Sequence, residues 1–210
     1  MQDVPLAVLT ATLLIYWIGV GVMIVRVRRA LRRSPGTDAP QHFERFNLMW
    51  VVWVALVAAW IGIPWATLAH SAKVPTLPSF ATSVPAYGAL RWIAAIVAVV
   101  SLAATIKCWK RMGTHWRMDV GVATKAPLIT DGFFARIRHP IYAFSILLML
   151  CSVAIVPTVP MLALAAIHIL MMNAKARSEE RHLIAVHGDA YARYLRASGR
   201  FFPRLRPPQA

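Results

Sequence analysis

Five apolar runs are the feature of this sequence that most limits its fold. They cover residues 6–25, 47–68, 86–106, 141–156 and 161–174. A helix needs about 20 mostly apolar residues to cross the hydrocarbon core of a bilayer. The whole chain is 59% hydrophobic and only 15% charged, with a mean hydropathy of +0.57, which is too apolar for a soluble domain of this length. The sequence therefore predicts an all-α, polytopic membrane protein, a single domain over residues 1–210 with about five transmembrane helices.

The last two runs flank Pro157-Thr158-Val159-Pro160. Proline lacks the amide donor of a helix and clashes with the preceding turn, so neither run continues through this segment. We expect a tight helical hairpin that crosses the membrane and returns, followed by a helical C-terminal tail. A three-span alternative, in which this hairpin is re-entrant, stays open from the sequence.

The basic residues predict the orientation of the chain. The formal net charge is +15, and every Lys and Arg except Lys73 and Arg91 follows the first run, the third run or the fifth run. With five spans, all three groups lie on one side of the membrane, and positively charged loops stay in the cytoplasm. The N-terminus is thus expected outside and the tail inside. This distribution indicates topology and contact with anionic membrane lipids, and it argues against nucleic-acid binding.

A first polar cluster, Arg138-His139-Pro140-Ile141-Tyr142, precedes the fourth run. Pro140 suits the first position of a helix, which makes His139 the expected cap. The free amide donors and the positive end of the helix dipole then face the cytoplasm and favour an anion. Tyr142 follows His139 by three residues and lies on the same face. The alternative is that these residues only anchor a span at the headgroup level.

A second polar cluster, Glu179-Glu180, follows the fifth run by about one and a half turns. One alternative is that the two carboxylates only form surface ion pairs with the cations of the basic tail. If the last helix continues past the membrane, however, they lie at the same end of the hairpin as His139 and Tyr142. Both clusters together would hold a ligand that has an anionic part and a cationic or hydroxylated part. We expect His139 and Glu180 to be solvent-side ligands and not part of the core.

Several motifs in this order resemble the isoprenylcysteine carboxyl methyltransferase family, and the phospholipid N-methyltransferases have the same pattern. The resemblance covers roughly residues 105–205. Its motifs are Gly113-Thr114-His115-Trp116, Leu128-Ile129-Thr130-Asp131-Gly132-Phe133-Phe134, the two polar clusters with the hairpin between them, Leu183, His187-Gly188-Asp189-Ala190-Tyr191-Ala192-Arg193-Tyr194 and Arg200-Phe201-Phe202-Pro203.

This resemblance implies a membrane enzyme that takes a methyl group from S-adenosylmethionine and gives it to a lipophilic or prenylated acceptor from the bilayer. It implies catalytic roles for Arg138, His139 and Glu180. The donor would be bound by His139, Pro140, Tyr142, Glu179, Glu180, Tyr191 and Tyr194. Interfacial anchoring is the equal alternative for the two tail tyrosines. No metal is expected, because the seven histidines are scattered and His182 with His187 lacks the spacing of a helical ligand pair.

Two departures from the family pattern leave the acceptor open. Phe144 stands where the family usually has glycine, and we expect its ring to point between spans toward the acceptor path. Asn173 and Lys175 stand where the prenylcysteine enzymes use arginine for the substrate carboxylate. Phospholipid or small-thiol methylation on the same fold, or a non-catalytic membrane subunit, remains the alternative. A membrane reductase related to sterol reductases and a transporter are disfavoured by the intact motifs and by the nearly clean spans.

Overall fold

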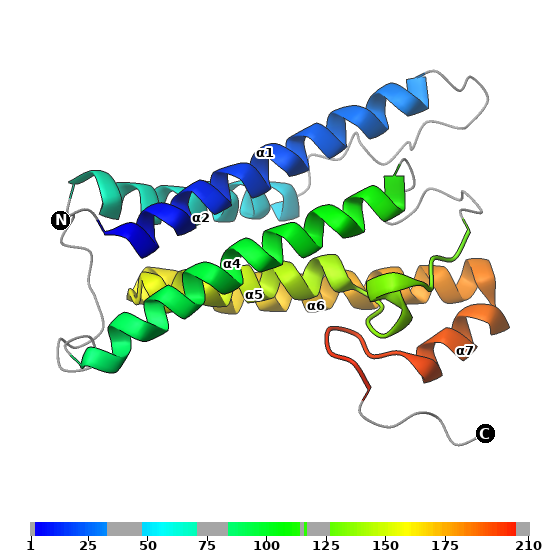
Figure 1. Cartoon of the computed structure of the whole chain (residues 1–210). Helices are drawn as coiled ribbons and strands as arrows, with labels where there is room; N and C mark the ends of the chain where they lie inside the picture. Colours follow the sequence, from blue (N-terminus) through cyan, green and yellow to red (C-terminus); the bar gives the residue numbers. More distant parts are fainter. Residues whose placement is uncertain (1–2, 33–47, 71–83, 114–115, 117–126, 205–210) are drawn as a thin grey trace.

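The computed structural model describes residues 3–32, 48–70, 84–113, 116 and 127–204. These residues form α1 (Val4–Arg32), α2 (Leu48–His70), α4 (Pro85–Met112), the 3-10 turn η3 (Gly132–Ala135), α5 (Pro140–Ile155), α6 (Val159–His187) and α7 (Asp189–Ala197). Within them there is no β-strand, only one isolated parallel bridge between Ile137 and Gly199. The predicted all-α fold is confirmed (Figure 1).

Four helices, α1, α2, α4 and α6, contain segments long and apolar enough to cross a membrane, and α5 is a shorter apolar helix of 16 residues. The chain is thus an integral membrane protein. The predicted hairpin is confirmed, because α6 begins at Val159 directly after α5 ends at Ile155 and the two helices pack together. The Tyr87 hydroxyl at the start of α4 donates to the Ala154 carbonyl at 3.0 Å. Hence α5 extends to the end of the bundle where α4 begins.

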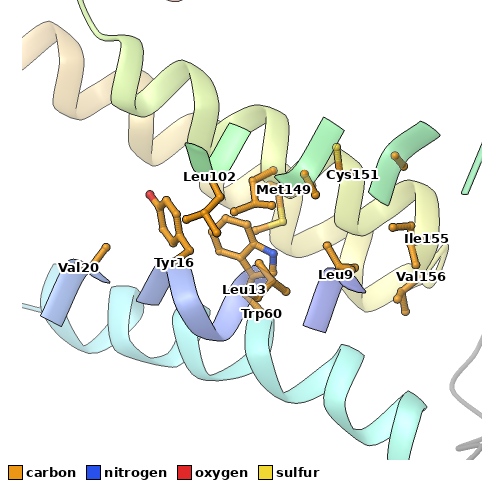
Figure 2. Packing of buried hydrophobic residues seen from close by; sticks show 14 of the residues in the cluster. Leu9, Leu13, Tyr16, Val20, Trp60, Leu102, Met149, Cys151, Ile155 and Val156 are labelled. Carbon is orange, nitrogen blue, oxygen red and sulfur yellow. The ribbon is translucent and has the colours of Figure 1, made fainter. Parts of the chain in front are cut away.

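The core lies where α4 and α5 pack together, with α1 against α4 and α2 against α1 and α6. One face of α1 supplies Leu9, Leu13, Tyr16 and Val20, all of them buried. Their spacing of three or four residues is that of one helical face. Figure 2 shows Leu13 and Tyr16 beside Trp60 of α2, and all of these side chains belong to one buried cluster with residues of α4 and α5. The opposite helix faces carry exposed apolar side chains such as Ile18, as expected for surfaces in contact with lipid.

The two ends of the bundle differ in charge. The ends of α1 and α4, the start of α5, the end of α6 and α7 gather at one end, which we name the basic end (Figure 1). At the other end, Arg91 Nη2 lies 2.5 Å from Asp3 Oδ2 and its guanidinium lies 5.9 Å from the Tyr87 ring centroid. The ion pair neutralises Arg91, so this end carries little net positive charge among the described residues. Lys73, the other predicted cation of this side, lies outside the described residues.

Close packing of α1 on α4 depends on Gly19. A Cβ atom built on Gly19 would lie 2.6 Å from Cζ3 of Trp109, and carbon atoms do not approach so closely. Trp109 is buried, and its ring centroid lies 5.6 Å from that of Tyr16. The missing side chain of Gly19 therefore lets the indole approach α1 closely.

Gly19→Ala should consequently destabilise the protein by about 1–3 kcal/mol, because the added methyl group forces the Trp109 ring out of place. Gly21→Ala is the matched control: nothing lies within 4 Å of its Cβ position, and alanine favours a helix over glycine by up to about 1 kcal/mol. The midpoints of thermal unfolding in detergent should move in opposite directions. A stabilising Gly19→Ala would contradict the packing described.

Candidate active site

The start of α5 has the predicted form. His139 is the N-cap residue of α5 and Pro140 follows it in the first turn. The first backbone bond of the helix runs from the Ala143 amide to the His139 carbonyl at 3.0 Å, and the imidazole makes no capping bond. The amides of Ile141 and Tyr142 precede that bond and therefore have no partner within the helix. Two amide donors and the positive end of the helix dipole thus define a place for an anion.

His139 and Tyr142 form one aromatic surface. Their ring centroids lie 5.4 Å apart with an interplanar angle of 2°, so the predicted common face is confirmed. The Tyr142 hydroxyl donates a short hydrogen bond to the Glu179 carboxylate. Lys175 Nζ lies 5.8 Å from the Tyr142 ring centroid. Because α6 is continuous to His187, Glu179 reaches the start of α5, and the two polar clusters meet as expected.

Glu180 is the ionic centre of this end of the protein. Its carboxylate accepts from Arg138 Nε at 2.9 Å and from Arg200 Nη2 at 2.5 Å. Arg138 Nη1 also donates to the carbonyl of Leu195 at 3.2 Å and to that of Ser198. A buried carboxylate is tolerated where paired cations replace its hydration. Two guanidinium groups provide that compensation here.

The expectation that His139 and Glu180 are solvent-side groups is wrong. His139 is 8% exposed and Glu180 is 6% exposed. Both are covered because α7 and the segment after it fold back over the start of α5. In the sequence, Glu180 lies in a basic tail, and this composition suggested a solvated surface. In the structure, Arg200 of the same tail pairs with Glu180 and so allows the carboxylate to be buried.

The returning segment pairs with the Arg-His-Pro motif through its backbone. The Arg138 amide donates to the Gly199 carbonyl at 2.8 Å, and the His139 amide donates to the Arg200 carbonyl at 3.1 Å. The Gly199 amide in turn donates to the Arg136 carbonyl at 3.0 Å. A Cβ atom on Gly199 would lie 1.7 Å from the Phe202 carbonyl oxygen, so only glycine fits this bend. The backbone pairing thereby delivers Arg200 to Glu180.

The contact of Arg200 with Glu180 was not predicted from the sequence. Arg200 also donates from Nη1 to Asn173 Oδ1 at 3.0 Å. Asn173 is one of the two positions where the sequence lacks the arginine of the prenylcysteine enzymes. A guanidinium group from the tail thus lies beside that position. The motif Arg200-Phe201-Phe202-Pro203 was the available signal, but nothing in its spacing indicated the partner.

The tail tyrosines are interior residues. Tyr191 is 1% exposed and Tyr194 is 9% exposed, and their ring centroids lie 5.8 Å apart. The Tyr194 hydroxyl donates to the Phe134 carbonyl of η3 at 2.5 Å, and burial raises the pKa of this phenol to about 12. Burial, followed by the charge of Glu180, raises the pKa of the Tyr191 phenol. Such burial against η3 and Glu180 disfavours the anchoring interpretation for both.

Phe144 lies beside the segment that precedes the motif. It is half-buried, and its ring packs edge to face on Phe133 of η3 with centroids 5.1 Å apart. Its described ring contact is thus with η3, away from the stacked rings of His139 and Tyr142. Whether it shapes an acceptor path stays a prediction.

The two glutamates control the charge of His139. Burial alone would lower the pKa of the imidazole, but Glu179 and Glu180 outweigh burial and raise it. His139 Nδ1 lies 3.4 Å from Glu179 Oε2, and Nε2 lies 3.5 Å from Glu180 Oε1. Although it is buried, Nε2 makes no hydrogen bond.

Chemically, the site combines an anion position, a carboxylate and an aromatic surface. The Glu179 side chain is 22% exposed, and its pairing is weaker than that of Glu180, so it is the carboxylate that remains open to a cation. In the part of the chain that the structure describes, no three His, Cys, Asp or Glu side chains are arranged to hold a metal ion.

One family model matches the chain. Residues 92–185 match the isoprenylcysteine carboxyl methyltransferase (ICMT) family, whereas the motifs in the sequence placed the resemblance at residues 105–205. The matched segment runs from α4 into the last turns of α6, includes both polar clusters and ends before Arg200. None of the curated proteins matches the chain. The predicted resemblance is confirmed for this central segment, over which the chain is similar to the membrane methyltransferases of that family.

The raised pKa of His139 predicts a pH dependence of stability. Because the folded state raises the pKa of His139, the protonated imidazole adds to the free energy of unfolding. This contribution is fully present below the ordinary pKa of 6.5 and is lost as the pH rises through the pKa in the folded state. The unfolding midpoint of the wild type should therefore fall more than that of His139→Gln between about pH 6 and about pH 9. Equal slopes for the two proteins in detergent would show that the imidazole is not held as a cation by the glutamates.

Proposed function

We propose that this protein transfers a methyl group from S-adenosylmethionine to a lipophilic acceptor. The observation that carries the proposal is the meeting of both polar clusters at one end of the hairpin. There, the first-turn amides of α5, the stacked rings of His139 and Tyr142, and the carboxylate of Glu179 lie close together. The match of this segment to the ICMT family supports the same conclusion.

The residues present fit the donor. Its carboxylate suits the amides of Ile141 and Tyr142 at the start of α5, where an anion is favoured. Its ammonium suits Glu179, and its adenine suits the aromatic surface of His139 and Tyr142. The buried His139 Nε2 has no hydrogen-bond partner, and an orphaned buried donor or acceptor is costly. A polar atom of the donor at this nitrogen would remove that cost.

S-adenosylmethionine, when bound, supplies a methyl group activated by a sulfonium. The task of the protein is then to align two reactants and to exclude water. We assign Glu179 and Tyr142 to binding, since they hold groups on the open side of the site. Arg138, Glu180 and Arg200 have their donors and acceptors occupied by one another, so we assign them to holding the tail over α5. Tyr191 and Tyr194 close the site by packing α7 onto η3 and Glu180.

The acceptor is proposed to arrive from the bilayer. The outer faces of α4, α5 and α6 expose apolar side chains such as Ile93, Leu150 and Leu170, which suits an acceptor with a long apolar part. An acceptor that already carries a negative charge needs no base. For an amine acceptor, His139 is the candidate base at a pH above its raised pKa, where the imidazole is neutral.

We also propose that the basic end faces the cytoplasm, with the N-terminus outside. The ion pair of Asp3 with Arg91 supports this orientation, because it removes the one described cation of the opposite end. Anionic lipids would then contact Arg26, Arg28 and Arg29 at the end of α1. A reporter that is active only in the cytoplasm should work when fused after Ala210 and fail when inserted near Thr76, which lies outside the described residues. The reverse pattern would overturn the orientation.

Glu179→Gln should weaken the binding of S-adenosylhomocysteine, the demethylated product of the donor, because the variant loses the carboxylate that faces the ammonium. A hydrogen bond to a charged group contributes about 1.5–3 kcal/mol, so Kd should rise on the order of 10- to 100-fold. Calorimetric titration in detergent measures this change. Asp131→Asn is the matched control, since it removes a carboxylate at the same end whose ion-pair partner among the described residues is the exposed Arg111.

Two outcomes of that titration would overturn the proposed function. Saturable binding of NADPH without binding of S-adenosylhomocysteine would indicate the reductase alternative. Absence of binding by a wild type that elutes as a single folded species would indicate a non-catalytic subunit. Equal affinities of the wild type and Glu179→Gln would remove Glu179 from the donor site.

A further inference from the structure

Two neighbouring phenylalanines after α7 lie in different environments. Phe201 is half-buried, and its ring centroid lies 6.4 Å from that of His139 at an interplanar angle of 62°. Phe202 is 79% exposed. A single exposed apolar ring has no special meaning on a surface that faces only water. The position of Phe202 relative to the membrane-spanning helices therefore decides its meaning.

Phe202 lies at the level where α5 enters the membrane part of the bundle. The Gly199 carbonyl accepts from the Arg138 amide at 2.8 Å, and the apolar helix α5 begins two residues later at Pro140. The bend of the chain keeps Phe202 at this level, because a Cβ atom on Gly199 would lie 1.7 Å from the Phe202 carbonyl oxygen. In Figure 1 the segment after α7 accordingly turns back toward the bundle. This is the level of the lipid headgroups.

Basic side chains accompany the exposed ring. Arg204 Nη1 donates to the Arg196 carbonyl in the last turn of α7 at 2.6 Å, and both arginines are exposed. Between residues 189 and 204 the chain has four arginines and a single acidic residue, Asp189. Aromatic and basic side chains together are typical of a segment at the membrane interface. The excess of positive charge favours anionic headgroups.

The same short segment covers the candidate site. We name residues 199–204 the tail tip. Its Arg200 pairs with the buried carboxylate of α6, and its Phe201 ring contacts His139. Phe202 follows these two residues directly. A lipid contact at Phe202 therefore acts on the residues that close the site.

We propose that Phe202, Arg196 and Arg204 form a contact surface for an anionic bilayer, and that this contact stabilises the closed position of the tail over α5. Lipid that binds the closed tail better than the opened tail shifts the equilibrium toward the closed one. The contact forms whichever side of the membrane the basic end faces. It depends neither on the methyl donor nor on the proposed function.

The position of Phe202 is measured with 4-fluorophenylalanine at this residue of the full chain, in bilayers of phosphatidylcholine with phosphatidylglycerol. Dissolved oxygen concentrates in lipid, whereas a nickel chelate stays in water, and each broadens a fluorine resonance that it reaches. We expect oxygen to broaden the resonance of position 202 more than nickel does. The same label at Phe201 is the matched control, because this half-buried ring should respond less to both agents.

Stronger broadening by nickel at position 202 would show a solvated tail and overturn the proposal. Protection from both agents that increases with the ratio of protein to lipid would show a second copy of the chain on Phe202. That result would overturn the proposal as well.

Hydrogen exchange measures the effect on the site. The amides of Arg138 and His139 donate to the tail tip, so they exchange when the tail opens. Phosphatidylglycerol added to phosphatidylcholine should slow their exchange roughly 3- to 10-fold. In the double variant Arg196→Gln, Arg204→Gln this dependence on phosphatidylglycerol should be lost.

The double variant Arg26→Gln, Arg29→Gln is the matched control, because it removes the same charge from exposed positions at the end of α1. It should keep the lipid dependence of the two amides. If the Arg196 and Arg204 variant does not fold, Phe202→Ser is judged by the same amides, whose exchange it should speed in bilayers. Exchange that lipid does not change in the wild type, or that Phe202→Ser leaves unchanged, would overturn the proposal.

Discussion

The buried carboxylate of Glu180 is the interaction on which the candidate site depends. It joins Arg138, just before α5, to Arg200, in the segment after α7, and itself belongs to α6. Removing one partner of such a pair leaves an uncompensated charge in the interior, which is strongly destabilising. The position of the tail over His139, and with it the shape of the site, therefore follows from this one carboxylate.

The elements of the fold were largely predictable because a bilayer imposes simple local rules. Apolar runs had to be helices, since backbone polar groups have no partner in lipid, and the helices α1, α2, α4, α5 and α6 lie where the runs predicted them. The prolines around Thr158 predicted the hairpin, and the Thr158 side chain indeed caps α6 by accepting from the Met161 amide. The helix start at His139 and Pro140 was predictable for the same local reason.

The internal contacts of the site were not predictable, because they join residues far apart in the sequence. Arg200 and Glu180 are twenty residues apart across a helix end and a turn, and no periodicity links them. The prediction of solvent-exposed ligands failed for this reason. Glu180 can be buried because the guanidinium group of Arg200 pairs with it, and Arg200 reaches Glu180 only when the tail is folded. The buried hydrogen bond between His168 and Ser145 was likewise not predictable, because one histidine in an apolar run gives no indication of its partner.

The central claim is that Glu180 and Arg200 hold the tail as one unit with the start of α5. A double-mutant cycle on the free energy of unfolding, with Glu180→Gln, Arg200→Gln and the pair, measures this coupling most directly. We expect the two changes to be non-additive, with a coupling energy of at least about 1 kcal/mol. Additivity within about 0.5 kcal/mol would show that the two residues act independently, and the description of the site as a structure closed by its tail would then be wrong.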